Sequence, residues 1–435
     1  MRQITIVEYG TIRRDDLGQR LLRGLQTFDE LHARDSGETI FDWSFLHHVK
    51  AKSHVGVVQI PGLAVEILPK IDDATSPEAR STQETSFKQA RHNLLYMLSV
   101  AGKLPFHERD LAALELQNLP MWEALIRVFV RRLLQELRRG QQHQYVYREE
   151  RLGSVRGRIL LSQQCSRSKG LEHHLFVGYD EFQNDTWLNR ILKAACTRLL
   201  PVTRLSQTQQ FLRESLLELA DVKTRHIEPH HFDKVQMDRN SERFAELLEF
   251  CRLVFLGATP SPQSGQKSSF SLLFPMETLF EEFVGGILRR NAEYWGLQRS
   301  QVHLQAQSRR KWLLRDSQER GRFRLKPDVI IDGPDGQPAV ILDTKWKRLL
   351  SDQEDSKNGV SQADIYQLYA YSHRYRCDNN ILLFPKVSGV TCKSYKLDGS
   401  ALERRLKVEF LDLNFNLRIQ RKRLLDEIAE LLFRT

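Results

Sequence analysis

The sequence predicts a multidomain α+β protein with a small β-rich N-terminal domain, a mainly helical middle domain and a C-terminal α/β domain. Three observations predict this class. The chain has 435 residues, which is too long for one comfortable core. Two polar stretches without apolar periodicity, at residues 72–90 and 257–269, separate three blocks. Apolar residues have strand spacing in the first block, helix spacing in the second and both in the third. We therefore expect domains at residues 1–85, 86–262 and 263–435.

The first block carries the pattern of a β-hairpin. Residues 55–60 and 63–69 are rich in Val, Ile and Leu, and they flank the turn dipeptide Pro61-Gly62. Such residues around a short turn are typical of two antiparallel strands. Residues 4–7 predict a further strand.

The second block carries three apolar runs at helix spacing, at residues 94–101, 125–137 and 188–199. Five arginines lie between the apolar positions of the second run or directly after it: Arg127, Arg131, Arg132, Arg138 and Arg139. They suit either a DNA-facing stripe or the solvated face of an amphipathic helix, and the second is the commoner reason for this pattern.

The third block alternates between helix and strand patterns. We expect a helix at residues 277–290, strands at 322–331 and 339–345, a helix at 362–375, a buried strand at 380–384 and another strand near Ser394. This order suits a small mixed sheet with flanking helices.

The charge of the chain is compatible with nucleic-acid binding. The formal net charge is +10 and the sequence pI is about 9.3. A basic protein favours a polyanionic partner, because each neutralised phosphate releases counterions. Many basic proteins never bind nucleic acid, so charge alone leaves both possibilities open.

Cysteine usage and hydropathy predict a protein of the reducing cytoplasm with no membrane span. The five cysteines are scattered and none forms a C-x-x-C pair, so neither a disulfide framework nor a zinc knuckle is indicated. The first residues lack the apolar core of a signal peptide, and no apolar run approaches the length of a membrane span.

Two carboxylates and one ammonium carry the predicted chemistry. Asp328 lies in a strand-like run, and Asp343 and Lys345 end the next one. Side chains alternate along a strand, so Asp343 and Lys345 point to the same face, and pairing of the two strands places Asp328 beside them. The competing interpretation is a surface ion pair at a strand end. Two other Asp-x-Lys triplets, at 221–223 and 355–357, follow no apolar strand.

Carboxylate oxygens suit Mg²⁺, which takes few protein ligands and keeps several waters. We expect Asp328 and Asp343 to bind this cofactor, with the backbone carbonyl of Thr344 as a further ligand. A metal in this position polarises a scissile phosphate and helps to generate hydroxide. Lys345 is placed to orient the attacking water and to offset charge on the phosphate.

Three neighbouring residues extend this candidate site. Glu281 lies among core-facing apolar residues of the predicted helix at 277–290, and it suits either the metal or an exposed position near the helix start. Gln367 and Tyr371 are four residues apart and share one helix face, from which they can hydrogen-bond the substrate backbone or the catalytic groups.

Two further signals are weaker. Paired histidines occur at 47–48, 173–174 and 230–231, but none has the frame of a zinc-binding helix. Trp346, beside two basic residues, suits stacking on DNA and core packing equally well.

Together, Glu281, Asp328, Asp343, Lys345, Gln367 and Tyr371 resemble the PD-(D/E)xK nuclease superfamily in its RecB-like branch. The motifs at residues 67–71, 93–98, 157–159, 184–192, 274–284 and 343–347 are similar to McrC, the nuclease subunit of the modification-dependent McrBC restriction system.

The resemblance to McrC implies partners. McrC-like chains act with McrB, an AAA+ ring that hydrolyses GTP and translocates DNA, and their N-terminal and middle blocks dock on the ring and stimulate it. In agreement, this chain has no G-x-x-x-x-G-K-[ST] loop. The implied substrate is modified, 5-methylcytosine-containing double-stranded DNA, and dimerisation of complexes would allow cleavage of both strands.

The sequence thus predicts a metal-dependent endodeoxyribonuclease subunit. Two alternatives stay open. One is a non-catalytic adaptor that activates an AAA+ motor and keeps a degenerate nuclease fold. The other is a stand-alone repair nuclease, which the large N-terminal blocks without nuclease motifs disfavour.

Overall fold

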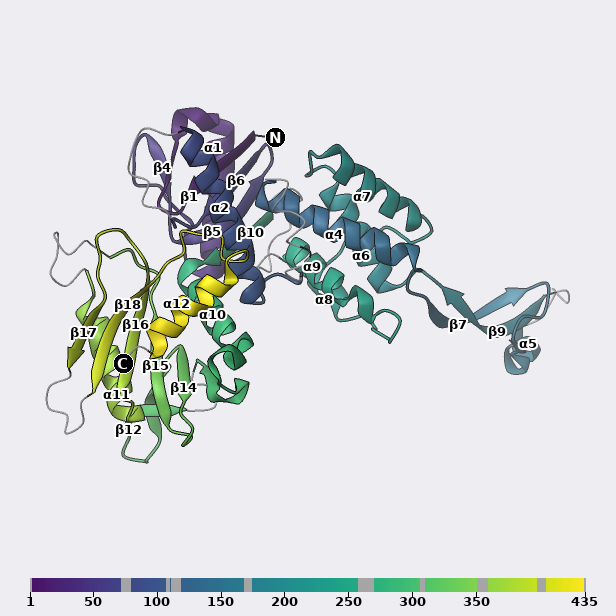
Figure 1. Cartoon of the computed structure of the whole chain (residues 1–435). Helices are drawn as coiled ribbons and strands as arrows, with labels where there is room; N and C mark the ends of the chain where they lie inside the picture. The colour runs from purple at the N-terminus through teal and green to yellow at the C-terminus, as the bar shows by residue number, and fades with distance from the viewer. Residues whose placement is uncertain are drawn as a thin grey trace. The chain divides into compact units, whose positions relative to one another are not determined.

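A computed structural model describes residues 2–71, 80–106, 110, 119–167, 174–256, 270–305, 310–349, 359–396 and 404–433 (Figure 1). Its contacts form two compact units, Met1–Met121 with Ser261–Thr435, and Trp122–Pro260. The three domains expected from sequence stay a prediction. In the contacts, however, residues 86–121 group with the N-terminal residues, and the expected linker at 257–269 lies outside the described residues.

The first unit begins with a four-stranded sheet in the order β1-β6-β5-β10. Its strands are β1 (Arg2–Val7), β6 (Leu63–Leu68), β5 (His54–Ile60) and β10 (Phe270–Pro275). The hairpin predicted from sequence is confirmed, because β5 and β6 are antiparallel. β10, which follows the middle block, pairs with β5. Where β5 and β10 pair, a Cβ on Gly56 would lie 1.9 Å from the Leu272 carbonyl oxygen, so only glycine fits at this position.

A small sheet and two helices complete the N-terminal part of this unit. The sheet has the order β2-β4-β3, and its strands are Thr11–Arg13, His48–Ala51 and Phe41–Asp42. Helix α1 (Arg14–Ser36), which we did not predict, packs Leu25 into the N-terminal core. Helix α2 (Arg80–Val100) contains the predicted run at 94–101.

The C-terminal part of the first unit is a six-stranded mixed sheet in the order β11-β14-β15-β16-β18-β17. Its strands are Val302–Leu304, Val329–Asp332, Pro338–Thr344, Asn379–Pro385, Arg405–Leu411 and Lys393–Lys396. β15, β16 and β18 are parallel to one another, and β14 is antiparallel to β15. The predicted mixed sheet is therefore present, with β18 as a strand that sequence reasoning missed.

Three helices flank this sheet: α10 (Met276–Arg290), α11 (Gln362–Tyr375) and α12 (Arg421–Phe433). Two were predicted within one residue of their bounds, and α12 was not predicted. α11 packs Leu368 and Tyr375 against Ile341 and Leu382 of the sheet. Short 3₁₀ turns at Ala292–Trp295 and Arg299–Gln301 lead from α10 to β11.

The single strand expected at 322–331 is instead two. β13 (Gly321–Leu325) pairs with β12 (Lys311–Arg315) in a separate hairpin, and β14 belongs to the main sheet. Pro327 lies in the break, where a residue without a backbone N–H cannot continue a ladder. Asp328 therefore stands at the start of β14.

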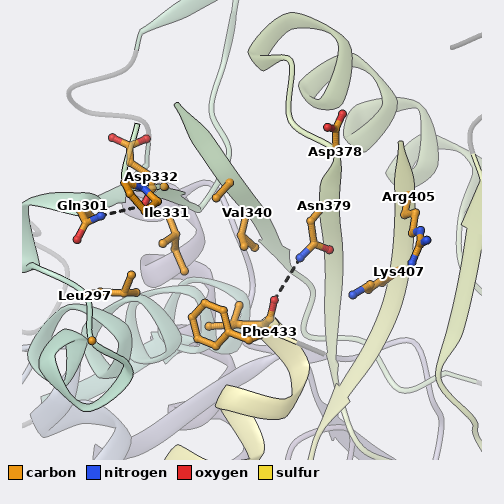
Figure 2. A pocket seen from close by; sticks show the side chains of 15 residues that line it. Leu297, Gln301, Ile331, Asp332, Val340, Asp378, Asn379, Arg405, Lys407 and Phe433 are labelled. Carbon is orange, nitrogen blue, oxygen red and sulfur yellow. Dashed lines mark hydrogen bonds between the residues drawn. The ribbon is translucent and has the colours of Figure 1, made fainter. Parts of the chain in front are cut away.

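The end of the sheet at which β15 and β16 begin borders a cavity of about 590 Å³ (Figure 2). Apolar side chains, among them Val340 and Phe433, line it together with Asp332 and Lys407. Asn379 donates to the Leu432 carbonyl oxygen (3.2 Å) and thereby ties α12 to this end.

The second unit is mainly helical, as predicted, but it also contains a three-stranded antiparallel sheet. The helices are α4 (Met121–Arg138), α5 (Leu161–Arg167), α6 (Trp187–Leu199), α7 (Ser206–Glu218), α8 (Pro229–Phe232) and α9 (Ala245–Leu256), with a 3₁₀ turn at Glu242–Phe244. The sheet has the order β7-β9-β8, with strands Gln144–Leu152, Leu175–Gln183 and Arg158–Ile159. Sequence reasoning missed it because β7 has no buried face and so no apolar alternation.

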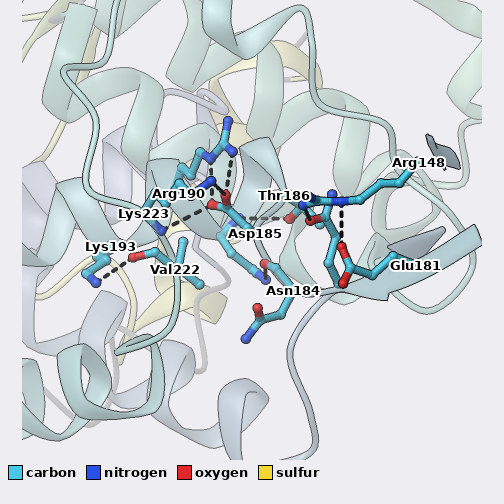
Figure 3. A network of polar contacts seen from close by, with 11 residues as sticks. Arg148, Glu181, Asn184, Asp185, Thr186, Arg190, Lys193, Val222 and Lys223 are labelled. Atoms are coloured by element: carbon cyan, nitrogen blue, oxygen red, sulfur yellow. Dashed lines mark hydrogen bonds and ion pairs between the residues drawn. The ribbon is translucent and has the colours of Figure 1, made fainter. Parts of the chain in front are cut away.

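A polar network fixes the junction between β9 and α6 (Figure 3). Arg190 donates twice to Asp185 (2.7 and 2.6 Å), and the Lys223 backbone N–H adds a third hydrogen bond (3.1 Å). The hydrogen bonds from Arg190 lower the pKa of Asp185 to about 2. Lys223, from one of the rejected Asp-x-Lys triplets, thus serves this structural junction.

Four of the five arginines that lie in or directly after α4 are engaged within their own unit. Arg132 pairs with Glu246, Arg138 with Glu214 and Arg139 with Glu136, while Arg127 donates to Gln207. These contacts favour the solvated helix face over a DNA-facing stripe.

Candidate functional site

Four elements of the first unit, β14, β15, α10 and α11, bring the predicted site residues to one end of the main sheet. β14 and β15 are antiparallel, with Val329 opposite Leu342, so Asp328 lies beside the end of β15. Thr344 donates from its backbone N–H and its hydroxyl to the same Asp328 oxygen, Oδ2 (2.7 Å each). The predicted approach of Asp328 to the Asp343–Lys345 segment is therefore present.

Asp343 and Lys345 share a face, as strand alternation predicts. The Lys345 ammonium lies 2.6 Å from Oδ2 of Asp343. The Asp343 side chain is buried, whereas that of Lys345 is 27% exposed. The Asp343 carboxylate is thus more deeply buried than the Lys345 ammonium, which reaches solvent.

Helix α11 contacts both Asp343 and Lys345 through Gln367. Lys345 donates to Oε1 of Gln367 (3.3 Å), and Nε2 of Gln367 lies 3.5 Å from Asp343 Oδ1. The same Nε2 donates to the Tyr371 hydroxyl (2.6 Å). Gln367 and Tyr371, chosen for their spacing alone, therefore meet the predicted trio, and Gln367 orients it.

Glu281 approaches from α10 and is half-buried. It accepts a hydrogen bond from Gln305 Nε2 (2.9 Å), and the Gln305 backbone N–H donates to the Asp328 carbonyl oxygen (2.7 Å). Burial raises the pKa of Glu281, and the charge of Asp343 adds to this effect. Glu281 is thus close enough for its pKa to depend on the charge of Asp343. Its role as a direct metal ligand stays a prediction.

The environment of the site disfavours the ionised form of its carboxyl groups. Burial, followed by repulsion from Asp343 and Glu281, raises the pKa of Asp328 to about 8. Burial also raises the pKa of Asp343, against the opposing effect of Lys345. Burial alone lowers the pKa of Lys345, but Asp343 and Asp328 outweigh it and raise that pKa. Carboxylates crowded in this way are relieved by a divalent cation.

The donor set fits Mg²⁺. Among the residues that the structure describes, no three His, Cys, Asp or Glu side chains form a group that could hold a metal, so a site here would rest on two carboxylates. Mg²⁺ accepts one or two carboxylates and keeps water in its remaining positions. The backbone N–H and hydroxyl of Thr344 hold Asp328, and its expected carbonyl ligand stays a prediction.

Trp346 is a core residue, which favours core packing over stacking on DNA. It is 8% exposed, and its indole N–H donates to both carboxylate oxygens of the buried Glu8 (2.9 and 3.0 Å). Its ring packs edge-on against Phe280, with 5.2 Å between centroids. Burial raises the pKa of Glu8 to about 7.

Two histidines of the expected pairs pack on aromatic rings. His231 stacks on Trp187 and His48 on Phe45, while His173 lies outside the described residues.

Sequence reasoning missed two residues of the site. Gln305 follows β11 in a left-handed conformation (φ 49°), which no local pattern announces. Asp364, in the first turn of α11, raises the pKa of both Asp343 and Lys345 by its charge. Only the position of Asp364 near the predicted start of the helix, close in sequence to Gln367, could have indicated that it lies near the site.

Comparison with known proteins identifies the family. The family described as "McrBC 5-methylcytosine restriction system component" matches residues 49–385. The chain belongs to this family. The resemblance inferred from sequence is therefore confirmed, and the chain is a component of a McrBC-type restriction system.

Individual relatives agree with this assignment. The type IV methyl-directed restriction enzyme EcoKMcrBC of Escherichia coli K12 is 24% identical over 319 residues, which are 71% of this chain and 89% of the relative. A half-complex from the tetradecameric assembly of Thermococcus gammatolerans McrB AAA+ hexamers with bound McrC has a similar fold. Its TM-score is 0.71 at 20% identity, over 98% of this chain and 100% of the other.

The Thermococcus gammatolerans McrBC complex solved by cryo-EM is also similar. Its TM-score is 0.56 at 23% identity, over 67% of this chain and 88% of the other. At these identities the two structures show a shared fold. Separately, no described helix has the length and apolarity to cross a membrane.

Proposed function

We propose that the chain is the Mg²⁺-dependent DNA endonuclease subunit of a McrBC-type restriction complex, with a nuclease domain of the PD-(D/E)xK type. The convergence of Asp328, Asp343 and Lys345 at the start of β14 and the end of β15, with Gln367 holding the last two, carries this proposal. Buried like charges at a sheet end cost stability and are typical of a catalytic site.

The side chains divide the work of phosphodiester hydrolysis among them. Asp328 and Asp343 would hold Mg²⁺, which when bound would supply polarisation of the scissile phosphate and a lower pKa for the attacking water. Lys345, held by Asp343 and Gln367, orients that water and offsets negative charge that develops on the phosphate. Tyr371 fixes Gln367 and so fixes the lysine indirectly.

The proposed partner is a McrB-like AAA+ GTPase ring, and the proposed substrate is modified, 5-methylcytosine-containing double-stranded DNA in the cytoplasm. The relatives support the partner, because one solved assembly of similar fold contains McrC bound to McrB AAA+ hexamers. The N-terminal and middle residues dock on the ring and stimulate its hydrolysis. One active site cuts one strand, so double-strand cleavage requires two copies of the chain.

The test is a nicking assay with Mg²⁺, in the presence and absence of the ring, with wild type and Lys345→Ala. The matched control is Lys347→Ala, an exposed lysine two residues away whose ammonium donates to the Gly359 carbonyl oxygen. We expect cleavage that needs the ring, is lost in Lys345→Ala and persists in Lys347→Ala. Ring stimulation without any cleavage by wild type would establish a non-catalytic adaptor. Cleavage by the chain alone would establish a stand-alone nuclease.

A further inference from the structure

The β12–β13 hairpin is inserted between Gln305 and Asp328, two residues of the candidate catalytic site. The chain leaves the main sheet after Gln305, which contacts both Glu281 and Asp328, and it returns through Leu325 to Asp328. The hairpin is therefore an excursion between β11 and β14, and its base packs against the last turn of α11.

The hairpin is the site of a local excess of positive charge. Residues 310–326 contain seven basic residues against two acidic ones, a net charge of +5 in a chain whose total is +10. Arg315, Arg320 and Arg322 are exposed. Their ion pairs with Asp316 and Glu319 are open to solvent, so exchanging these partners for phosphates costs little free energy.

The hairpin also exposes apolar side chains. Phe323 is 72% exposed, and Leu314 is 54% exposed. Phe323 has a left-handed backbone (φ 55°), a strained conformation for a bulky residue. The strand register pairs Trp312 with Arg324 and Leu314 with Arg322 and passes over Phe323. A strained backbone thus presents an aromatic ring to solvent between two arginines.

The base of the hairpin is fastened to α11. The Lys311 ammonium donates to the Arg374 carbonyl oxygen (3.0 Å), and the Arg374 guanidinium donates to the Trp312 carbonyl oxygen (2.8 Å). Lys311 also lies 4.8 Å from the centre of the Tyr375 ring. Because α11 also carries Gln367, one helix positions both the catalytic lysine and the hairpin.

We propose that the β12–β13 hairpin is a clamp for duplex DNA: its arginines hold the phosphate backbone of the duplex that enters the candidate site, and Phe323 packs against a base step of that duplex. Basic side chains supply most of the affinity for DNA, and inserted apolar side chains kink and fix base steps. This inference rests on the proposed nuclease function, since it takes DNA as the substrate of the candidate site.

The test measures duplex binding by the full chain in an Asp343→Asn background, so that cleavage does not enter. We expect Arg320→Ser with Arg322→Ser to weaken binding about tenfold and to reduce the slope of log affinity against log salt by about one to two. The matched control is Arg20→Ser with Arg23→Ser, two exposed arginines of α1, and it should change neither quantity.

Phe323 is tested separately. We expect Phe323→Ala to weaken binding about fivefold at an unchanged salt slope, and Phe323→Trp to restore it. Hairpin variants that bind like the α1 control, or a wild type that binds no duplex, would overturn the inference. If the hairpin variants lose binding while wild-type protein never cleaves, the clamp stands and the proposed nuclease function fails.

Discussion

The first unit contains two buried carboxylate–cation pairs that are built differently. In the N-terminal sheet, Glu66 receives two donors on each oxygen: Arg91 and the Met121 backbone N–H on Oε1 (2.8 Å each), and Arg91 and Thr5 on Oε2 (2.6 and 2.9 Å). At the candidate site, Asp343 has Lys345 on one oxygen and a long contact to Gln367 on the other.

We infer that the difference separates a structural pair from the pair proposed to act in catalysis. Glu66 is saturated by donors, as buried charges in a stable core are. Asp343 is buried beside Asp328 and near Glu281, and burial raises the pKa of both aspartates. Such crowding costs stability and leaves oxygen lone pairs available to a cation. The sheet end therefore keeps an arrangement that folding alone does not favour.

The largest expected effect is on cleavage by Asp343→Asn. This change removes one ligand charge, and we expect nicking by the assembled complex to fall about a thousandfold or more. The melting temperature should stay the same or rise, because a crowded charge is removed. The control is Asp335→Asn, an exposed turn residue in the same sheet. Wild-type cleavage by Asp343→Asn would contradict the comparison.

The opposite result is expected for Glu66→Ala. It leaves Arg91 buried without its partner, and we expect the free energy of unfolding to fall by about 3–5 kcal/mol. The specific nicking rate of the folded fraction should be unchanged. Denaturant unfolding, followed by a nicking assay on the folded protein, measures both quantities. A stable but inactive Glu66→Ala protein would show that the Glu66–Arg91 pair serves activity and not stability, against the comparison.

The pH dependence of stability sharpens the comparison. The pKa of Asp328 is raised to about 8 in the folded chain, against about 3.9 when unfolded. The folded state therefore holds a proton that the unfolded state releases, and metal-free stability should fall as pH rises from about 4 to about 8. Asp328→Asn should flatten this decline, and so should Mg²⁺. Identical slopes in metal-free wild type and variant would contradict the assignment.

The smallest expected effect belongs to Tyr371→Phe. The tyrosine hydroxyl accepts a hydrogen bond from Gln367, which in turn contacts Lys345 and Asp343. Its loss should loosen the lysine and reduce the nicking rate about tenfold, with little change in DNA affinity. A matched loss in affinity and rate would place Tyr371 on the substrate instead.

Sequence predicted the local part of this site. The apolar run that ends in Asp343-Thr344-Lys345 and the i, i+4 spacing of Gln367 and Tyr371 are local patterns, and the structure brings these residues together. Pro327 explains why Asp328 stands at a strand start, although we expected one unbroken strand there.

The missed features depend on distant pairings. β10 completes a sheet whose other strands lie some two hundred residues earlier, and no periodicity reports such a partner. Gln305 reaches the site through a left-handed turn, and Trp346 is buried by Glu8 from the first strand region. β7 has no buried face, so no apolar alternation in the sequence predicts it.

The central claim is that Asp328 and Asp343 bind a divalent cation together. Titration of Mn²⁺ into the full chain, followed by electron paramagnetic resonance, tests it without DNA, motor or turnover. We predict that wild type binds Mn²⁺, that Mg²⁺ competes for the site, and that Asp328→Asn with Asp343→Asn abolishes it while Asp335→Asn does not. Undiminished Mn²⁺ binding by the folded double variant would contradict the claim.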